Sequence, residues 1–147
     1  MIELLFTFFL LVLLLLVISV IWRINARKYV SSGTVASAYD AWTQDKLLER
    51  LWGEHIHLGF YPSGKKNIDF RKAKVQFVHE LVKWSGLDKL PQGSRILDVG
   101  CGIGGSSRIL AEYYGFNVTG ITISPAQVKR ARELTPHGLN CTFQVMD

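Results

Sequence analysis

The sequence has few cysteines, no strong excess of charge of either sign, and no internal repeat. Its 147 residues include two cysteines, Cys101 and Cys141, too few for the disulfide framework of a small secreted domain. Lys and Arg total 17 against 12 Asp and Glu, a formal net charge of only +5. No nucleic-acid-binding motif accompanies this small excess, so we expect no nucleic-acid partner. With 48% hydrophobic and 20% charged residues, the composition excludes intrinsic disorder and leaves room for one domain.

What is present first is a long apolar run near the N-terminus. From Leu4 to Trp22, 19 consecutive residues carry no charge, and 16 of them are Leu, Ile, Val or Phe. A helix of this length rises about 28 Å, close to the roughly 30 Å hydrocarbon core of a bilayer. Its apolar side chains would contribute on the order of −5 to −10 kcal/mol to insertion. Residues 4–22 are therefore predicted to form a transmembrane anchor.

Two alternatives to an anchor, a cleaved signal peptide and a buried core helix, fit this run less well. A signal peptide has basic residues before a shorter apolar stretch. Here Glu3 precedes the run, and Arg23, Arg27 and Lys28 follow it. A core helix would have a polar face, which the run lacks at any helical period. The cations that follow predict a membrane protein whose remaining domain is cytoplasmic, joined to the anchor by a polar tether over residues 23–34.

The rest of the chain, residues 35–147, alternates between helical and strand patterns. We predict helices over 35–51 (with a break near residue 43), 69–85, 106–114 and 125–134, a loop over 52–64, and strands over 95–99, 117–123 and 141–145. Gly115 has the position of a left-handed helix cap, and Ser124 with Gln127 has the spacing of a capping box. Strands that alternate with helices imply parallel, right-handed crossovers. The fold class is therefore predicted to be α/β with a doubly wound sheet.

The predicted sheet is incomplete. In doubly wound folds the first strand lies in mid-sheet, yet one edge of strand 95–99 has no partner in the sequence. We therefore expect residues 35–147 to be the N-terminal half of a longer domain. A half sheet buries too little apolar area to offset chain entropy, so residues 1–147 alone are expected neither to fold cooperatively nor to catalyse a reaction.

The most informative stretch is the glycine-rich loop ILDVGCGIGG, residues 96–105, which begins in a predicted strand and leads into a helix. Its glycines allow a tight turn and a close approach of backbone to a ligand. They also fit the G-x-G-x-x-G pattern of dinucleotide sites, so a nicotinamide-dependent reductase stays open as an alternative. Asp98 argues against it, because a carboxylate there would repel a pyrophosphate. The end of the second strand, Thr122-Ile123-Ser124, also lacks the acid that would bind a ribose. Asp98 instead suits a ligand that carries an ammonium and a sulfonium, S-adenosylmethionine.

The loop resembles motif I of the class I methyltransferases, which bind S-adenosylmethionine, and the wider chain resembles the tocopherol methyltransferase family. The stretches that carry this resemblance are YDAW at 39–42, WGEHIHLGFY at 52–61, the glycine loop, GFNVTGITISP at 115–125 and QVKRA at 127–131. The chain looks most like the cyanobacterial-type members, which act on 2-methyl-6-phytylbenzoquinol. The resemblance implies a Rossmann-like fold and C-methylation of a prenylated quinol ring in tocopherol or plastoquinone synthesis. Other C-, O- and N-methyltransferases share this loop, and a non-catalytic membrane protein with a vestigial nucleotide fold also stays open.

The resemblance further implies which residues bind the cofactor. These candidates are Asp98, Val99, Gly100, Cys101, Gly102, Gly104, Gly105, Thr122, Ile123, Gln127 and Asp147. The first part of this set matches the portion of motif I around the methionine end of the cofactor. Thr122 stands where many class I enzymes have a ribose-binding acid; it and Gln127 offer a hydroxyl and an amide, or are only a strand residue and a cap. Asp147 stands where family members have an acid near the adenine amino group.

His55 and His57 are the candidate catalytic residues. They alternate, so in an extended segment their side chains share a face. A histidine, with an ordinary pKa of about 6.5, is suited to remove the proton of a quinol, although a packed or surface role is the alternative. A metal site would need a third ligand that is missing nearby. The aromatic residues Trp52, Phe60 and Tyr61 are candidates for a pocket around a prenyl tail or for plain core.

Five cations cluster around Asp69: Lys65, Lys66, Arg71, Lys72 and Lys74. They form either a solvated helix face or a contact with anionic membrane lipid, which would contribute about 1 kcal/mol per cation.

Overall fold

The computed structural model of the chain describes residues 2–25, 31–63 and 67–147, in two compact units that divide between Ala38 and Tyr39. The N-terminal unit contains α1 (Ile2–Asn25) and the start of α2 (Ser32–Gln44). Within α1, the 18 residues Leu5–Trp22 are long and apolar enough to cross a membrane, and none of them is buried. Residues 26–30 lie outside the described residues.

The boundaries of the predicted tether, 23–34, differ from the structure at both ends. Helix α1 continues through Asn25, and α2 already begins at Ser32. Arg23 and Ile24 have adequate helix propensity and nothing after Trp22 breaks the helix, so the loss of hydrophobicity there is not a loss of helical structure.

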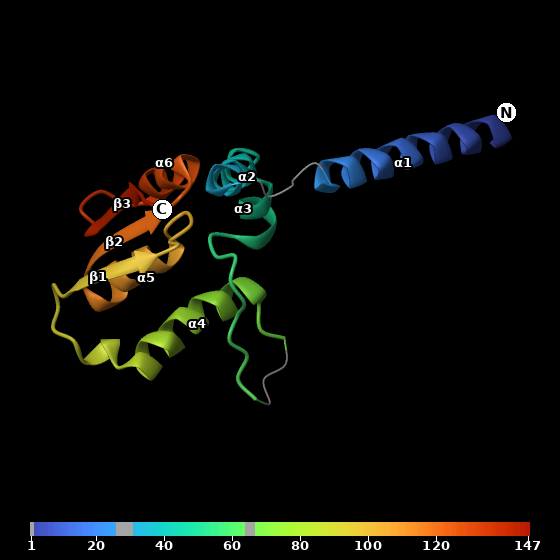
Figure 1. Ribbon diagram of the computed structural model, residues 1–147. Coiled ribbons are helices and arrows are strands. Elements are labelled where there is room, and N and C mark those ends of the chain that lie inside the picture. Colours follow the sequence, from blue (N-terminus) through green and yellow to red (C-terminus); the bar gives the residue numbers. More distant parts are fainter. Residues whose placement is uncertain (1, 26–30, 64–66) are drawn as a thin grey trace. The chain divides into compact units, whose positions relative to one another are not determined.

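The second unit continues α2 and adds eight further elements (Figure 1). They are α3 (Leu47–Trp52), α4 (Phe70–Ser85), the 3-10 helix η1 (Leu87–Lys89), β1 (Arg95–Val99), α5 (Gly105–Tyr114), β2 (Asn117–Thr122), α6 (Pro125–Leu134) and β3 (Cys141–Val145). The break expected near residue 43 lies between α2 and α3, where Lys46 has a left-handed backbone with φ 53°. The loop after α3 contains no strand among its described residues.

The strands form a parallel sheet in the order β1-β2-β3, with Asp98 beside Gly120 and Gly120 beside Phe143 (Figure 1). Val118 of β2 packs in a core cluster with α4 and α5. Two residues on, Gly120 lies close beneath the side chain of Phe143, which packs against α6. Residues two apart on a strand share a face, so α4, α5 and α6 all cover one face of the sheet.

The opposite face of the sheet carries no helix in the described part of the chain. Leu97 is 59% exposed, and Val99 on the same strand is 73% exposed. The physical reason is handedness: two right-handed crossovers that advance in one direction along a sheet place both of their helices on the same side.

Local signals set the ends of the helices in this unit. Asp69 accepts hydrogen bonds from the backbone amides of Arg71 and Lys72, both at 3.0 Å, and so caps α4. Gly115 closes α5 in the left-handed conformation, with φ 69°. Because the carboxyl ends of parallel strands meet at one edge of a sheet, the turns after β1 and β2 are brought together there.

Candidate functional site

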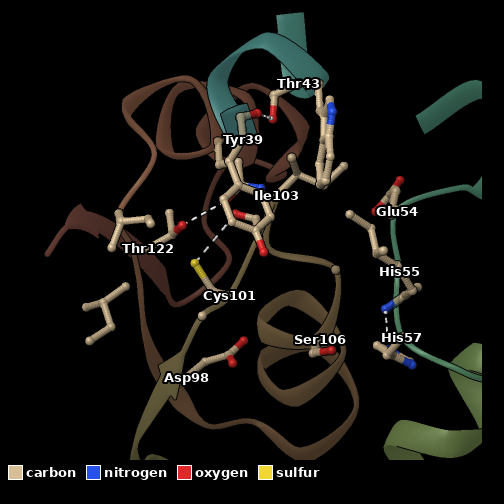
Figure 2. Close-up of a pocket in the computed structure, with 18 of the residues that line it drawn as sticks. Tyr39, Thr43, Glu54, His55, His57, Asp98, Cys101, Ile103, Ser106 and Thr122 are labelled. Carbon is tan, nitrogen blue, oxygen red and sulfur yellow. Dashed lines mark hydrogen bonds between the residues drawn. The ribbon is translucent and has the colours of Figure 1, made fainter. Parts of the chain in front are cut away.

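A cavity of about 550 Å³ lies at the carboxyl ends of β1 and β2 (Figure 2). Figure 2 shows His55 and His57 along one side of it, Asp98 and Thr122 on the sheet side, and Tyr39 and Thr43 on α2. The predicted site residues in its wall are His55, His57, Asp98, Val99, Gly100, Cys101, Gly102, Gly105, Thr122, Ile123, Gln127 and Asp147. Gly104 is the member of the predicted set that does not line this cavity.

The glycine loop turns tightly because three of its glycines adopt positive φ. Gly100 and Gly102 have φ of 75° and 55°, and a side chain at either position would meet nothing within 4 Å. Gly104, with φ 81°, has a different role, because a Cβ there would lie 2.7 Å from the Phe143 ring. The amides of Gly100 and Cys101 donate to the carbonyl of Ile121 at 2.9 and 3.0 Å, which ties the loop to β2.

Asp98 presents a partly buried carboxylate in the wall of the cavity. Its Oδ2 accepts a hydrogen bond of 2.6 Å from the hydroxyl of Ser107, a fully buried residue of α5. Burial raises the pKa of Asp98, while the Ser107 hydrogen bond and the nearby His57 act in the opposite direction. The fold therefore holds an acid in a place that would favour a positively charged ligand group.

Thr122 and Gln127 bind each other across the turn after β2. The Thr122 hydroxyl donates to Gln127 Oε1 at 2.7 Å, in a buried position. The predicted capping box is consequently half formed: Ser124 accepts from the backbone amide of Gln127 at 3.1 Å, but the Gln127 side chain turns to Thr122. Among the described residues, the side-chain amide nitrogen of Gln127 has no hydrogen-bond partner, so this pair presents an amide donor at the cavity.

The two histidines lie together although their loop is not a strand. His57 Nε2 and His55 Nδ1 are 3.1 Å apart, and His57 Nδ1 lies 2.8 Å from the carbonyl oxygen of Leu58. Burial, reinforced by His57, lowers the pKa of His55 to about 4. His55 is therefore neutral at physiological pH and has a ring nitrogen available as an acceptor.

Lys74 fixes the backbone of the loop after α3 that contains His55 and His57, called the histidine loop below. This position corrects the assignment of Lys74 to a solvated or lipid-facing cluster. It is 4% exposed, and its Nζ donates to the carbonyls of Trp52 at 3.1 Å and of His55 at 2.7 Å. Burial lowers the pKa of Lys74, with a smaller contribution from Arg71. Of the other cations in the cluster, Arg71 donates to the carbonyl of Arg50 at 2.7 Å, and residues 65–66 lie outside the described residues.

The loop is also held against α5. Glu54 forms an ion pair with Arg108, a buried residue of that helix. A Cβ on Gly105 would lie 2.8 Å from His55 Cε1 and 2.9 Å from the Glu54 carbonyl oxygen. Gly105 therefore lacks a side chain because the histidine loop crosses directly above it, and its φ is not in the left-handed region.

The sequence analysis did not predict that residues of α2 form part of the cavity wall. Tyr39, Trp42 and Thr43 line the cavity. Asp40 accepts hydrogen bonds from the Ser124 hydroxyl and from the Ala126 amide, the latter at 3.0 Å, and so joins α2 to the start of α6. The YDAW stretch was a signal for this helix, but its partners lie more than 80 positions away in sequence. Conversely, the aromatic candidates Trp52, Phe60 and Tyr61 are absent from the wall of this cavity.

Known proteins resemble this chain in both sequence and structure. A family model described as "Methyltransferase domain" matches residues 96–147. The 2-methyl-6-phytyl-1,4-hydroquinone methyltransferase of Synechocystis is 59% identical over 127 residues, which cover 86% of this chain and 40% of that protein. A probable tocopherol O-methyltransferase of rice chloroplasts is 39% identical over 120 residues, covering 77% of this chain and 33% of that protein.

Among solved structures, magnesium protoporphyrin IX methyltransferase from Synechocystis matches with a TM-score of 0.55 and 28% identity. The match covers 79% of this chain and 51% of that one, which was solved with S-adenosylhomocysteine bound. The described strands and helices thus have the class I methyltransferase fold with a partial sheet of three parallel strands. These likenesses support S-adenosylmethionine as the cofactor.

The chain spans 40% or less of the length of the two relatives, and its identity to them extends well beyond the glycine loop. By its sequence, the chain is similar to the tocopherol methyltransferase family, of the cyanobacterial type.

Proposed function

We propose that this protein is a membrane-anchored, S-adenosylmethionine-dependent methyltransferase that methylates a ring carbon of a prenylated benzoquinol in tocopherol or plastoquinone synthesis. The observation that carries the proposal is the carboxylate of Asp98 beside the glycine loop, in the wall of a cavity at the ends of β1 and β2. The acceptor class comes from the Synechocystis relative, whose name gives a prenylated hydroquinone.

The residues of the cavity fit S-adenosylmethionine better than a dinucleotide. Asp98 is an anion that suits the cationic methionine end, whereas it would repel a pyrophosphate. Thr122 and Gln127 offer neutral hydrogen-bonding groups where a dinucleotide site has an acid for the ribose. The cavity volume of about 550 Å³ also lies within the range of small-molecule sites. When bound, the cofactor supplies a methyl group activated by a sulfonium.

In this proposal, different residues of the chain bind different parts of the cofactor. Asp98, Val99, Gly100, Cys101, Gly102 and Gly105 surround the methionine end, with Gly104 shaping the turn, and Thr122, Ile123, Gln127 and Asp147 hold the nucleoside. His55 and His57 face the acceptor. Because the sulfonium already makes a good electrophile, most of the rate comes from positioning the acceptor ring against it.

The apolar part of the wall supports a lipophilic acceptor. Trp42, Leu48, Ile56, Ile103 and Met146 line the same cavity as the histidines. A prenylated quinol presents both an apolar tail and hydroxyl groups, so it uses both kinds of surface.

The anchor is a separate part of the proposal. The segment Leu5–Trp22 has the length and composition of a membrane span, and a prenylated acceptor is itself dissolved in lipid. A single span with the catalytic domain on the cytoplasmic side would keep the enzyme where its acceptor accumulates.

The proposed reaction is tested with full-length protein in membranes, S-adenosylmethionine labelled with ¹³C at the methyl, and 2-methyl-6-phytylbenzoquinol. NMR of the product is expected to show the label on a ring carbon. The oxidised quinone, which lacks the hydroxyls, serves as a matched control acceptor and is expected to remain unlabelled. Label on oxygen would reassign the acceptor atom, and absence of any transfer by a protein that binds S-adenosylhomocysteine would refute the choice of acceptor.

A further inference from the structure

The hydrogen bonds of the two histidines form a chain in which His55 donates to His57 and His57 donates to the carbonyl of Leu58. The carbonyl oxygen of Leu58 can only accept, so His57 Nδ1, 2.8 Å away, must carry a proton. In neutral His57 the other nitrogen, Nε2, is then an acceptor. It lies 3.1 Å from His55 Nδ1, so that nitrogen must be the donor. While His57 is uncharged, the Leu58 carbonyl thereby sets the tautomer of both rings and leaves His55 Nε2 without a proton.

His55 Nε2 is open to a ligand. It has no hydrogen-bond partner among the described residues, and it is not one of the fully enclosed polar atoms of this part of the chain. Its ring lines the cavity that also contains Asp98. The bond from His55 Nδ1 to His57, the contact of Cε1 with the Gly105 position and the bond from Lys74 to the His55 carbonyl hold the ring in place.

We propose that, within the methyltransferase function proposed above, His55 Nε2 takes the hydroxyl proton of the acceptor while His57 relays the resulting charge. As the acceptor O–H bond breaks, its electron pair stays on oxygen and the proton binds His55 Nε2. In the same step the His55 Nδ1–H bond breaks and that proton binds His57 Nε2. His55 ends neutral in the opposite tautomer, and His57 ends as an imidazolium whose Nδ1–H still donates to Leu58. His55 is thus the catalytic residue and His57 a positioning residue that acts through it.

The charges around each ring favour this division. Around His55 lie His57, Arg108 and Lys74, which oppose a positive charge, and Glu54, which favours one. Because the burial of His55 also disfavours a charge on its ring, a proton that stayed there as an imidazolium would be costly. His57 instead lies near enough to the carboxylate of Asp98 to lower the pKa of that acid. A relay places the charge where an anion faces it.

The tautomers can be read directly by long-range ¹H–¹⁵N NMR of the full-length protein in detergent, labelled with ¹⁵N-histidine. The chain has only four histidines, so the assignment is tractable with single His79 and His137 variants. At neutral pH we expect both His55 and His57 to carry their proton on Nδ1. His55 in the common Nε2–H form would overturn the proposal.

Two substitutions of His57 separate positioning from folding. His57→Gln keeps an acceptor for His55 Nδ1–H and should keep the His55 tautomer, whereas His57→Leu removes it and should release His55 to the Nε2–H form. With His57→Leu we expect kcat to fall on the order of 10²-fold, the lower range for general-base catalysis, with little change in KM for the acceptor. If His55 has the same tautomer in the His57→Gln and His57→Leu variants, and kcat is also the same in both, the relay is contradicted.

A parallel titration with S-adenosylhomocysteine distinguishes failure of this inference from failure of the proposed function. A protein that binds S-adenosylhomocysteine and methylates a quinol, but shows His55 as Nε2–H, refutes the relay alone. A protein with the expected tautomers that does not bind S-adenosylhomocysteine refutes the proposed function instead.

Discussion

Asp98 is the residue whose chemistry separates the possible ligands of this cavity. It is an acid held partly out of water by the end of β1 and by α5, with Ser107 as its hydrogen-bond donor. Burial raises its pKa because the charged form loses hydration. A cationic ligand group would replace that lost hydration, and an anionic one would make the cost larger.

The raised pKa of Asp98 predicts that cofactor binding is linked to pH. The raised pKa makes the free Asp98 carboxylate easier to protonate, whereas a bound cation requires the charged form. Binding therefore releases protons, and affinity falls as the pH is lowered through the pKa of Asp98. Calorimetry of S-adenosylmethionine over a series of pH values, in two buffers of different ionisation enthalpy, measures this release. Asp98→Asn should abolish it; an unchanged proton release in that variant would assign it to another group.

At the scale of elements, the sequence predicted the α/β part closely, because its boundaries depend on neighbouring residues. The strand 95–99 and the helix 125–134 were predicted with the bounds that β1 and α6 have, and the helix 106–114 begins one residue earlier, at Gly105. Ser124, Pro125 and Gly115 are short-range signals that need no knowledge of tertiary structure.

What the sequence could not predict are the contacts between distant segments. Lys74 was placed among solvated cations, because periodicity alone does not show that two carbonyls of a loop, 19 and 22 positions earlier, converge on its ammonium group. In the same way, the pairing of Gln127 with Thr122 replaced the capping geometry that the local pattern favours. The single layer of helices likewise depends on how crossovers advance along the sheet.

Removal of the Lys74 ammonium is predicted to loosen the histidine loop. Lys74→Met keeps most of the side-chain volume but leaves the carbonyls of Trp52 and His55 without their donor, which costs about 1–3 kcal/mol of local order. We expect KM for the acceptor to rise roughly 10-fold, with a much smaller change in S-adenosylhomocysteine affinity. Hydrogen exchange of residues 53–57 should increase in parallel. The exposed neighbour Lys72→Met is the matched control, and equal effects of both substitutions would argue against the assigned role.

Asp40 is predicted to stabilise the contact between α2 and α6. Asp40→Ala removes an acceptor for the Ser124 hydroxyl and the Ala126 amide at the helix N-terminus, where a negative charge is favourable. The expected loss is about 1–2 kcal/mol in the free energy of unfolding, measured by urea denaturation of the full-length enzyme. Asp45→Ala, at an exposed acid in the connection after α2, should change it by less than about 0.5 kcal/mol. A loss of similar size in both variants would mean that the Asp40 contact contributes little.

At the scale of the whole molecule, an apolar helix precedes a unit whose proposed acceptor is lipophilic. The segment Leu5–Trp22 carries no charge and none of its residues is buried, while the second unit contains the cavity. In the proposed function the two parts have separable roles: the helix sets the location of the enzyme, and the second unit binds the cofactor and the acceptor.

The proposed anchor predicts that the protein stays in the membrane pellet after a carbonate wash, because burial of the apolar run is not reversed by high pH or salt. Deletion of residues 1–30 should move the protein to the supernatant and slow methylation of a membrane-dissolved quinol, while leaving S-adenosylhomocysteine affinity unchanged. Wild-type protein recovered in the supernatant, or a mature N-terminus near Tyr39, would show that the run is not a permanent anchor.

The central claim is that the cavity at the ends of β1 and β2 binds S-adenosylmethionine through Asp98, and calorimetry on the full-length protein tests it most directly. S-Adenosylhomocysteine and NADPH are titrated separately into wild-type protein and Asp98→Ala. The account predicts binding of S-adenosylhomocysteine, no binding of NADPH, and a loss of about 1.5–3 kcal/mol in the variant, roughly 10- to 150-fold in affinity. Binding of NADPH, or unchanged S-adenosylhomocysteine affinity in a correctly folded Asp98→Ala protein, would contradict it.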